Sequence, residues 1–253
     1  MTSRQVLFGA LLLFGLLGSA QSAVDPGSLP TLLSQFRAET DRDAKQMILI
    51  QIEMNYPHAG PDLLAEAKGP ENGDTNWMAI QGIGALRFAG AVPFLEASLR
   101  SNSALVRENS TWALGRIGDR RAIRPLIAGL SREQDRRMIE VTALALTMLQ
   151  ARNAIPVLKS KIGNPSGQTR ILILGAVESL GGRAELPFIA AFLNDPNFGV
   201  REHAALSVER LSGEHFGFQP CKYRAYGGCG TGDESPIINA QRWWAKQRQD
   251  AKA

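Results

Sequence analysis

The sequence has little of what an enzyme gathers into a catalytic site. It contains three histidines and two cysteines in 253 residues. No histidine has a second one four residues further on, as a helical metal site would require, and no Gly-x-Ser-x-Gly nucleophile elbow is present. The glycine-rich run at 227–232 has no strand before it and no helix directly after it, which argues against a phosphate-binding loop. These absences predict a protein that is not an enzyme and that has no metal or other cofactor.

Aromatic residues are also scarce, at 7% of the chain, and few runs alternate in the way that β-strands do. A fold built from β-sheets is therefore not expected. Hydrophobic residues make up 44% of the chain and charged residues 21%, as in an ordinary globular protein. This composition favours one domain or one continuous array of repeats.

The first 23 residues have the pattern of a secretory signal peptide. Arg4 gives the segment a positive start, Val6–Leu17 is an almost unbroken apolar run, and small residues follow it. A membrane anchor is the alternative, but the run is shorter than the ~20 residues that a bilayer span needs. We therefore expect cleavage between Ala20 and Val24, a periplasmic or secreted protein, and no membrane span after cleavage.

Export would place Cys221 and Cys229 in an oxidising compartment, where the short segment KYRAYGG between them can turn back on itself. We expect a disulfide between these two cysteines, because a metal site would need further ligands and only His215 lies near in sequence. Loss of Arg4 lowers the formal charge from +4 by one. Nucleic acid is not an expected partner for such a mildly basic, exported chain.

Five prolines recur at a nearly constant interval, and each lies just before or within an apolar run. They stand 31 or 32 residues apart, at Pro61, Pro93, Pro125, Pro156 and Pro187. Proline is favoured in the first turn of a helix, and a repeat of this length is typical of stacked helical pairs. The spacing predicts one array in which each proline marks the second helix of a pair.

Apolar columns follow the same period. In the first helix, apolar residues stand ten and seven positions before Pro156, at Leu146 and Leu149, and likewise before Pro187; before Pro125 they stand one position further back, at Leu114 and Ile117. In the second helix, an apolar residue follows two positions after the proline, at Leu63, Leu95, Ile127, Leu158 and Ile189. We expect these columns to form a core that each unit shares with its neighbours. An aspartate at position 127 should then open the array in its middle.

The helix ends are marked as well. The breaks between paired helices carry a residue suited to a left-handed C terminus, at Gly90, Gly118, Asn153 and Gly182. Asn164-Pro165 and Asp195-Pro196 predict two helix starts with a capping side chain. The segment 29–38 predicts an N-terminal capping helix, and Trp243 with Trp244 should cover the last repeat. Trp112, inside a first helix, is expected in the core.

Residues 106–127, with the sequence VRENSTWALGRIGDRRAIRPLI, resemble the short HEAT repeats of the bilin-lyase type, and the phrase returns as VREHAALSVERLSG at 200–213. The resemblance covers about 40–213. It implies an all-α fold, a right-handed α-solenoid of stacked helical hairpins like those of HEAT and armadillo proteins. We expect a signal peptide at 1–23, the solenoid with its capping helix at 24–213, and a disulfide loop with a closing helix at 214–253.

Basic residues indicate where a partner could bind. Between Arg116 and Arg137 the chain has seven arginines and three acidic residues. Cations also recur seven positions after the first three prolines, where they either complement the helix dipole or form a row across stacked repeats. The expected partner-binding residues are Lys68, Arg100, Arg116, Arg120, Arg121 and Arg132.

Two functions follow from these patterns. The first is a monomeric, non-catalytic scaffold of the bacterial cell envelope that binds another, acidic protein. The alternative is an accessory lyase-like or cofactor- and chromophore-handling factor on the same repeats, since proteins with such repeats include chromophore lyases. The alternative predicts a pocket around His203, His215 and the tail loop. Export argues against it, because the substrates of bilin lyases are intracellular.

Overall fold

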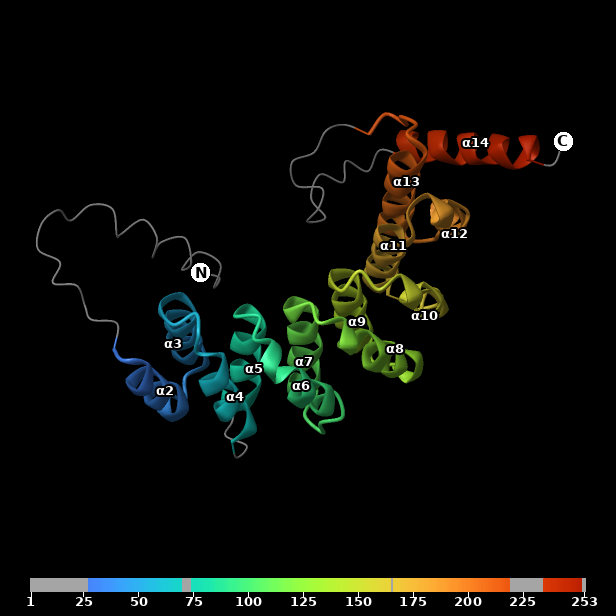
Figure 1. Cartoon of the computed structure of the whole chain (residues 1–253). Coiled ribbons are helices and arrows are strands. Elements are labelled where there is room, and N and C mark those ends of the chain that lie inside the picture. The colour runs from blue at the N-terminus through green and yellow to red at the C-terminus, as the bar shows by residue number, and fades with distance from the viewer. Residues whose placement is uncertain (1–26, 70–73, 165, 219–233, 252–253) are drawn as a thin grey trace, which may run out of the picture.

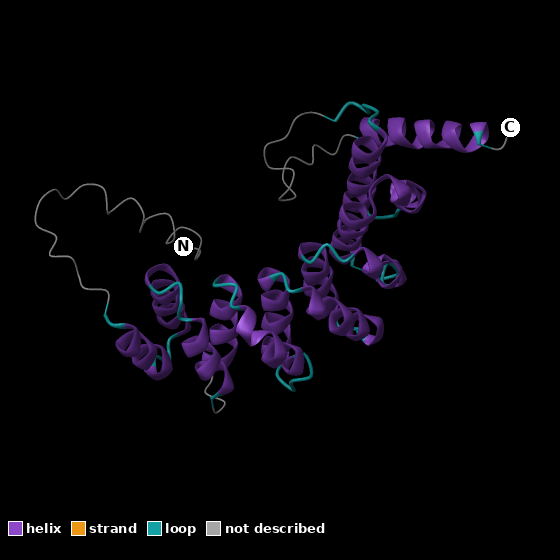
Figure 2. Ribbon diagram, in the orientation of Figure 1, coloured by secondary structure: helices purple, strands orange, loops and turns teal. Residues whose placement is uncertain are grey.

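The computed structural model describes residues 27–69, 74–164, 166–218 and 234–251, and over these ranges the chain is a curved array of helices (Figure 1). Every regular element in the described part is helical, so the predicted all-α solenoid is confirmed (Figure 2). None of the described helices combines the length and apolar character that a bilayer span requires. The predicted signal peptide at 1–23, Cys221 and Cys229 lie outside the described residues.

The described helices form five pairs and a final first helix, with one further helix at each end. The first helices of the units are α3 (Arg42–Asn55), α5 (Thr75–Ala85), α7 (Ala104–Ile117), α9 (Arg136–Met148), α11 (Gly167–Gly181) and α13 (Phe198–Ser212). The second helices are α4 (Gly60–Lys68), α6 (Val92–Ser98), α8 (Ile123–Arg132), α10 (Ile155–Ser160) and α12 (Leu186–Ala190). The terminal helices are α2 (Leu29–Ala38) and α14 (Ser235–Asp250). Short 3-10 turns are η2 (Ala89–Ala91), η3 (Arg120–Ala122), η4 (Arg152–Ala154), η5 (Gly182–Glu185) and η6 (Ala191–Asn194).

The first helices pack against one another along the inner side of the curve, and the second helices lie along its outer side (Figure 1). Small residues make this close approach possible. A Cβ added to Gly84 would lie 2.8 Å from the Cα of Ala113, and one added to Gly115 would lie 2.8 Å from the Cα of Ala145. Helices α5, α7 and α9 are therefore in backbone contact, and larger side chains at these glycines would force them apart.

The core consists of two columns that repeat every 31 or 32 residues. The first helices supply Ile83, Leu114, Leu146, Val177 and Val208, all with no exposed surface. The second helices supply Leu63, Leu95, Leu126, Leu158 and Ile189, at most 2% exposed. Each such side chain contributes roughly 1.5–3 kcal/mol when it leaves water. Adjacent units share the columns, and the buried residues form two clusters, one from Leu32 to Leu180 and one from Leu174 to Ala240.

The prediction for Ile127 is wrong by one residue. Helix α8 begins at Ile123, which makes Pro125 its third residue, whereas the other four repeat prolines are the second residue of their helices. Arg124 occupies the second place instead. Leu126 therefore enters the core, and Ile127 is only half-buried against it.

The helix starts also differ from the prediction at two places. Asn164 and Asp195 do not cap the helices that follow them; Ser166 and Asn197 do, by accepting the N–H groups of residues 169 and 200. The side chains of Asn164 and Asp195 instead accept the N–H groups of Ser166 and Asn197, at 2.9 and 2.8 Å. Each forms a turn that leads into the helix, so the capping role passes two residues along the chain.

The breaks follow the prediction in two of four cases. Gly118 and Gly182 have positive φ angles of 82° and 62°. At the other two breaks, the residue with positive φ is Arg87 or Gln150, three positions before the predicted glycine or asparagine. The next amide in each case donates to the carbonyl five residues earlier, at 3.1 and 3.0 Å. This bond satisfies the helix end without a glycine.

The arginine of the Val-Arg-Glu phrase has a structural role. Arg107 donates to the carbonyl oxygens of residues 101 and 102, at 2.7 and 3.1 Å, and so fixes the turn before its own helix. Arg170 and Arg201 bind the corresponding turns, and each also pairs with a carboxylate further along, Asp195 or Glu234. Arg170 and Arg201 thus join successive units. The guanidinium groups of all three arginines are bound within the protein.

Both ends of the array are closed by apolar side chains. Helix α2 has the predicted bounds and buries Leu32, Leu33 and Phe36. At the other end, the ring of Trp243 lies 5.9 Å from that of Phe216 and 6.2 Å from that of Trp244, in contact with the core of the last repeat. The terminal helices therefore cover the faces that have no neighbouring repeat.

The register of α8 predicts a difference between two adjacent residues. Leu126→Ala should lower the free energy of unfolding by about 2–5 kcal/mol because it leaves a cavity in the shared core. Ile127→Ala should cost at most about half of that, because its side chain already contacts water. Urea denaturation followed by circular dichroism measures both. Equal losses would contradict the register described above.

Candidate functional site

A groove of about 510 Å³ lies on the inner side of the solenoid, over α5, α7 and α9 and reaching α11. It is lined by Trp77, Gln81, Leu105, Glu108, Asn109, Trp112, Arg137, Glu140, Val141, Leu144 and Leu172. We call this hollow the inner groove. Its lining comes from the faces of the first helices that stacking leaves uncovered, so its residues are not all needed for the core.

The first helices carry most of the exposed apolar side chains of the described residues. Leu105 and Leu144, both 43% exposed, lie in the inner groove. Met47, Met54 and Met148 are also exposed and lie on α3 and α9. Exposed apolar side chains that gather in one place, as Leu105 and Leu144 do in the inner groove, mark a surface that binds an apolar ligand or a partner.

The charged residues of the inner groove form ion pairs or hydrogen bonds with other residues of the protein. Arg137 of α9 donates to Glu108 of α7 at 2.6 Å, and this hydrogen bond raises the pKa of Arg137. Glu140 accepts a hydrogen bond from the hydroxyl of Thr169 at 2.7 Å. Because these groups bind one another, an apolar ligand could enter without leaving a charge unpaired.

The two tryptophans of the inner groove each lie beneath an arginine. The guanidinium of Arg42 stands 5.7 Å from the Trp77 ring and that of Arg116 stands 5.5 Å from the Trp112 ring. Arg42 is paired with Asp74, which also accepts from the Trp77 indole. Arg116 has no ion-pair partner among the described residues, and its Nε is buried without a hydrogen-bond partner. No acidic group of the described residues therefore neutralises its charge.

The prediction that Trp112 belongs to the core is only partly right. Its ring packs against the core but remains half-buried, and it lines the inner groove. The error has a simple cause: a large apolar residue within a helix is usually buried by a neighbouring helix, whereas α7 presents this one toward the groove.

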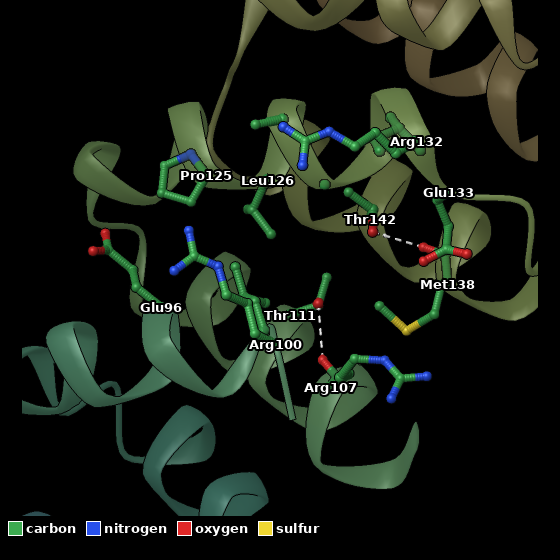
Figure 3. A pocket seen from close by; sticks show the side chains of 14 residues that line it. Glu96, Arg100, Arg107, Thr111, Pro125, Leu126, Arg132, Glu133, Met138 and Thr142 are labelled. Carbon is green, nitrogen blue, oxygen red and sulfur yellow. Dashed lines mark hydrogen bonds between the residues drawn. The ribbon is translucent and has the colours of Figure 1, made fainter. Parts of the chain in front are cut away.

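The predicted basic residues lie in four separate places. Arg100 and Arg132 line one pocket, which Figure 3 shows. Arg116 lies over Trp112, and Lys68 lies 5.8 Å from the ring of Phe94. Arg120 and Arg121 are exposed on η3, where Arg121 is bound by Asp119. The six residues are therefore not a single surface.

The pocket with Arg100 and Arg132 is formed by α6 and α8 with the starts of α7 and α9, and it has a volume of about 280 Å³. We call it the outer pocket. Leu126, Leu130 and Met138 contribute buried apolar side chains to its lining. Thr111 and Thr142 also line it, and their hydroxyls donate to carbonyls of their own helices.

The histidines of the alternative prediction line neither hollow. His203 of α13 is largely covered, its Nε2 has no hydrogen-bond partner, and burial lowers its pKa. Burial alone would raise the pKa of nearby Glu178, but hydrogen bonds from Arg210 and Ser207 lower it below its usual value. His215 is exposed, 3.6 Å from Glu209. In the described ranges, no three potential metal ligands gather.

Comparison with known proteins supports the repeat fold. Residues 60–147 match the family described as HEAT repeats. No curated protein matches the sequence. Among 28 matching chains of solved structures is one from the complex of CpcE and CpcF of phycocyanin lyase from Nostoc sp. PCC7120. It is 18% identical, with a TM-score of 0.52, and the match covers 76% of this chain and 80% of that chain. The predicted resemblance to bilin-lyase-type HEAT repeats is thus confirmed as a likeness of fold.

The lyase comparison corrects the prediction that the protein is not an enzyme. That prediction relied on missing catalytic motifs, yet a chain of the same fold is part of a phycocyanin lyase. A HEAT solenoid therefore belongs among the folds that support lyase chemistry, and the lack of a known motif does not decide against an enzyme.

The covered position of His203 predicts a pH-dependent stability. The pKa of His203 is lower in the folded chain than in the unfolded chain. At a pH between these two pKa values, the unfolded chain therefore binds more protons than the folded chain. The free energy of unfolding should then fall as the pH drops from about 7 to 5. Glu178 opposes this shift and Arg210 adds to it. His203→Gln should flatten the dependence of the thermal-unfolding temperature on pH. A dependence that survives His203→Gln would contradict the assignment.

Proposed function

We propose that this protein is a lyase-like factor that handles a chromophore or related cofactor together with a partner protein. The inner groove holds the chromophore, with its conjugated rings against Trp77 and Trp112. The observation that carries the proposal is this groove, which joins exposed apolar side chains to two indole rings on a fold similar to that of a phycocyanin lyase chain.

The chemistry of the inner groove suits a planar, conjugated molecule with carboxylate groups. Each aromatic contact contributes about 0.5–1.5 kcal/mol beyond the area it buries. Arg116, which has no ion-pair partner among the described residues, offers a charge-assisted hydrogen bond to a carboxylate at the edge of the Trp112 ring. Leu105 and Leu144 would leave water when the ligand binds, which adds to the affinity.

A partner protein is part of the proposal for two reasons. The similar lyase chain comes from a complex of two proteins. A solenoid also offers a long surface whose residues vary without disturbing the core. We propose that the protein itself is monomeric until it meets this partner.

Binding of biliverdin, a linear tetrapyrrole, tests the inner groove. We expect the protein to bind biliverdin with a change in its visible absorbance and with quenching of tryptophan fluorescence. Leu144→Glu should weaken binding at least tenfold, a loss of about 1.4 kcal/mol, because it places a charge in the groove. Met54→Glu adds the same charge at another exposed site and serves as the control. No binding, or equal binding by the two variants, would refute the proposed role.

We also propose that the protein acts after export, in the cell envelope, because residues 1–23 have the pattern of a signal peptide. Expression of the full chain in a bacterium should yield a protein whose N terminus, found by mass spectrometry, lies between Ala20 and Val24. Recovery of the uncleaved chain in the cytoplasm would refute export. It would not affect the proposal that the inner groove binds a chromophore.

A further inference from the structure

We propose that the outer pocket is a docking site for an acidic segment of the partner protein, in which one glutamate or aspartate binds between Arg100 and Arg132. The partner belongs to the proposed function, but the surface is a different one. Ligand binding at the inner groove and partner binding at the outer pocket can therefore be tested separately, and either one can be refuted while the other is supported.

Arg100 and Arg132 occupy equivalent places in successive units. Arg100 follows the end of α6, and Arg132 is the last residue of α8. Both side chains are exposed, and neither has an ion-pair partner within the described ranges. The two guanidinium groups lie on opposite sides of Leu126 in the outer pocket, with that of Arg100 on the side of Pro125 and Glu96 (Figure 3). A carboxylate above Leu126 can accept hydrogen bonds from both.

Two carboxylates, Glu96 and Glu133, line the outer pocket with these arginines, and neither forms an ion pair with Arg100 or Arg132. Arg107 also lines the outer pocket, but one of its nitrogens is bound to two backbone carbonyls. The carboxylate of Glu133 accepts the N–H groups of residues 134 and 135 through one of its oxygens, at 2.8 Å each. A cation near the C terminus of a helix also complements the dipole, but for only about 0.3–1 kcal/mol. Binding of a carboxylate by two guanidinium groups is stronger than that.

The size and lining of the outer pocket suit a side chain. Its volume of about 280 Å³ lies below the roughly 300–1,000 Å³ of sites that enclose a small molecule. Leu126 and Leu130 are 2% and 1% exposed and give the pocket an apolar floor, against which the methylene groups of a glutamate can pack. An acidic residue with an apolar neighbour in the peptide therefore fits better than a free anion.

The surrounding chain favours an acidic partner over a longer range. Segment 96–137 contains nine arginines and five carboxylates, a net charge of +4, which equals the formal net charge of the whole sequence. Concentrating the charge in this segment raises the rate at which an acidic protein arrives, and the effect weakens with added salt. The positive charge attracts the acidic partner to this region, and the outer pocket binds one acidic residue of the partner.

A labelled ten-residue peptide of glutamate, aspartate and leucine tests the outer pocket by fluorescence anisotropy. Removing both charges with Arg100→Gln and Arg132→Gln should weaken binding at least tenfold. The matched control, Arg120→Gln with Arg124→Gln, removes the same charge from exposed arginines outside the outer pocket and should weaken binding no more than about threefold. Both doubles change exposed side chains, so folding should be preserved, and biliverdin binding by the first double should match that of the native chain.

Four results would overturn the proposal. The first is no binding of the peptide by the native chain at low salt. The second is an equal loss in the two double variants, which would reduce the effect to overall charge. The third is displacement of the peptide by millimolar acetate or phosphate, which would make the outer pocket a site for small anions. A dimer that Arg100→Gln and Arg132→Gln dissociate would assign the outer pocket to a second copy of this chain and would also overturn it.

Discussion

Backbone contact between consecutive first helices is the constraint on which the rest of the structure depends. Gly84 and Gly115 have no room for a side chain, because the Cα atoms of Ala113 and Ala145 lie only 2.8 Å from where a Cβ would be. The first helices therefore stack closely, and the array bends with these helices on its inner side (Figure 1). This bend brings Trp77, Trp112 and Leu144 of three different repeats onto one wall. The inner groove thus follows from the stacking, although none of these three side chains makes the contact that causes it.

The period of the prolines was enough to predict the architecture, because each unit must bury its apolar face against the next. The register within a unit was less certain for a physical reason. A proline is tolerated at more than one position of the first turn, where the N–H groups have no partner in the helix. Leaving Leu126 in water would cost roughly 1.5–3 kcal/mol. Packing therefore decides the register, and Pro125 moves one place along α8. The caps at Ser166 and Asn197 were missed for a similar reason, since a turn and a cap use the same kinds of side chain.

The sequence predicted the cations of the outer pocket but not the inner groove. Arg100 and Arg132 occupy equivalent positions in adjacent repeats, and stacking of the repeats brings equivalent positions close together. The groove residues also recur with the repeat: Gln81, Trp112 and Leu144 stand 31 or 32 residues apart. Comparing these positions with the buried column at Ile83, Leu114 and Leu146 would have shown apolar residues on a second face of the same helices. A single sequence does not tell which of two apolar faces meets a neighbour, so Trp112 was assigned to the core.

The two sides of the solenoid differ in how firmly successive repeats are joined. Helices α5, α7 and α9 are in backbone contact, whereas the second helices α8 and α10 approach each other at fewer residues. Bending of the array should therefore occur by opening and closing the outer side about a fixed inner edge. Arg100 and Arg132 belong to neighbouring repeats on that outer side, so a side chain held by both would act as a tie between them. Binding of the partner would then limit bending of the array. Binding on the outer side would thereby fix the distance between the indole rings of Trp77 and Trp112 on the inner side.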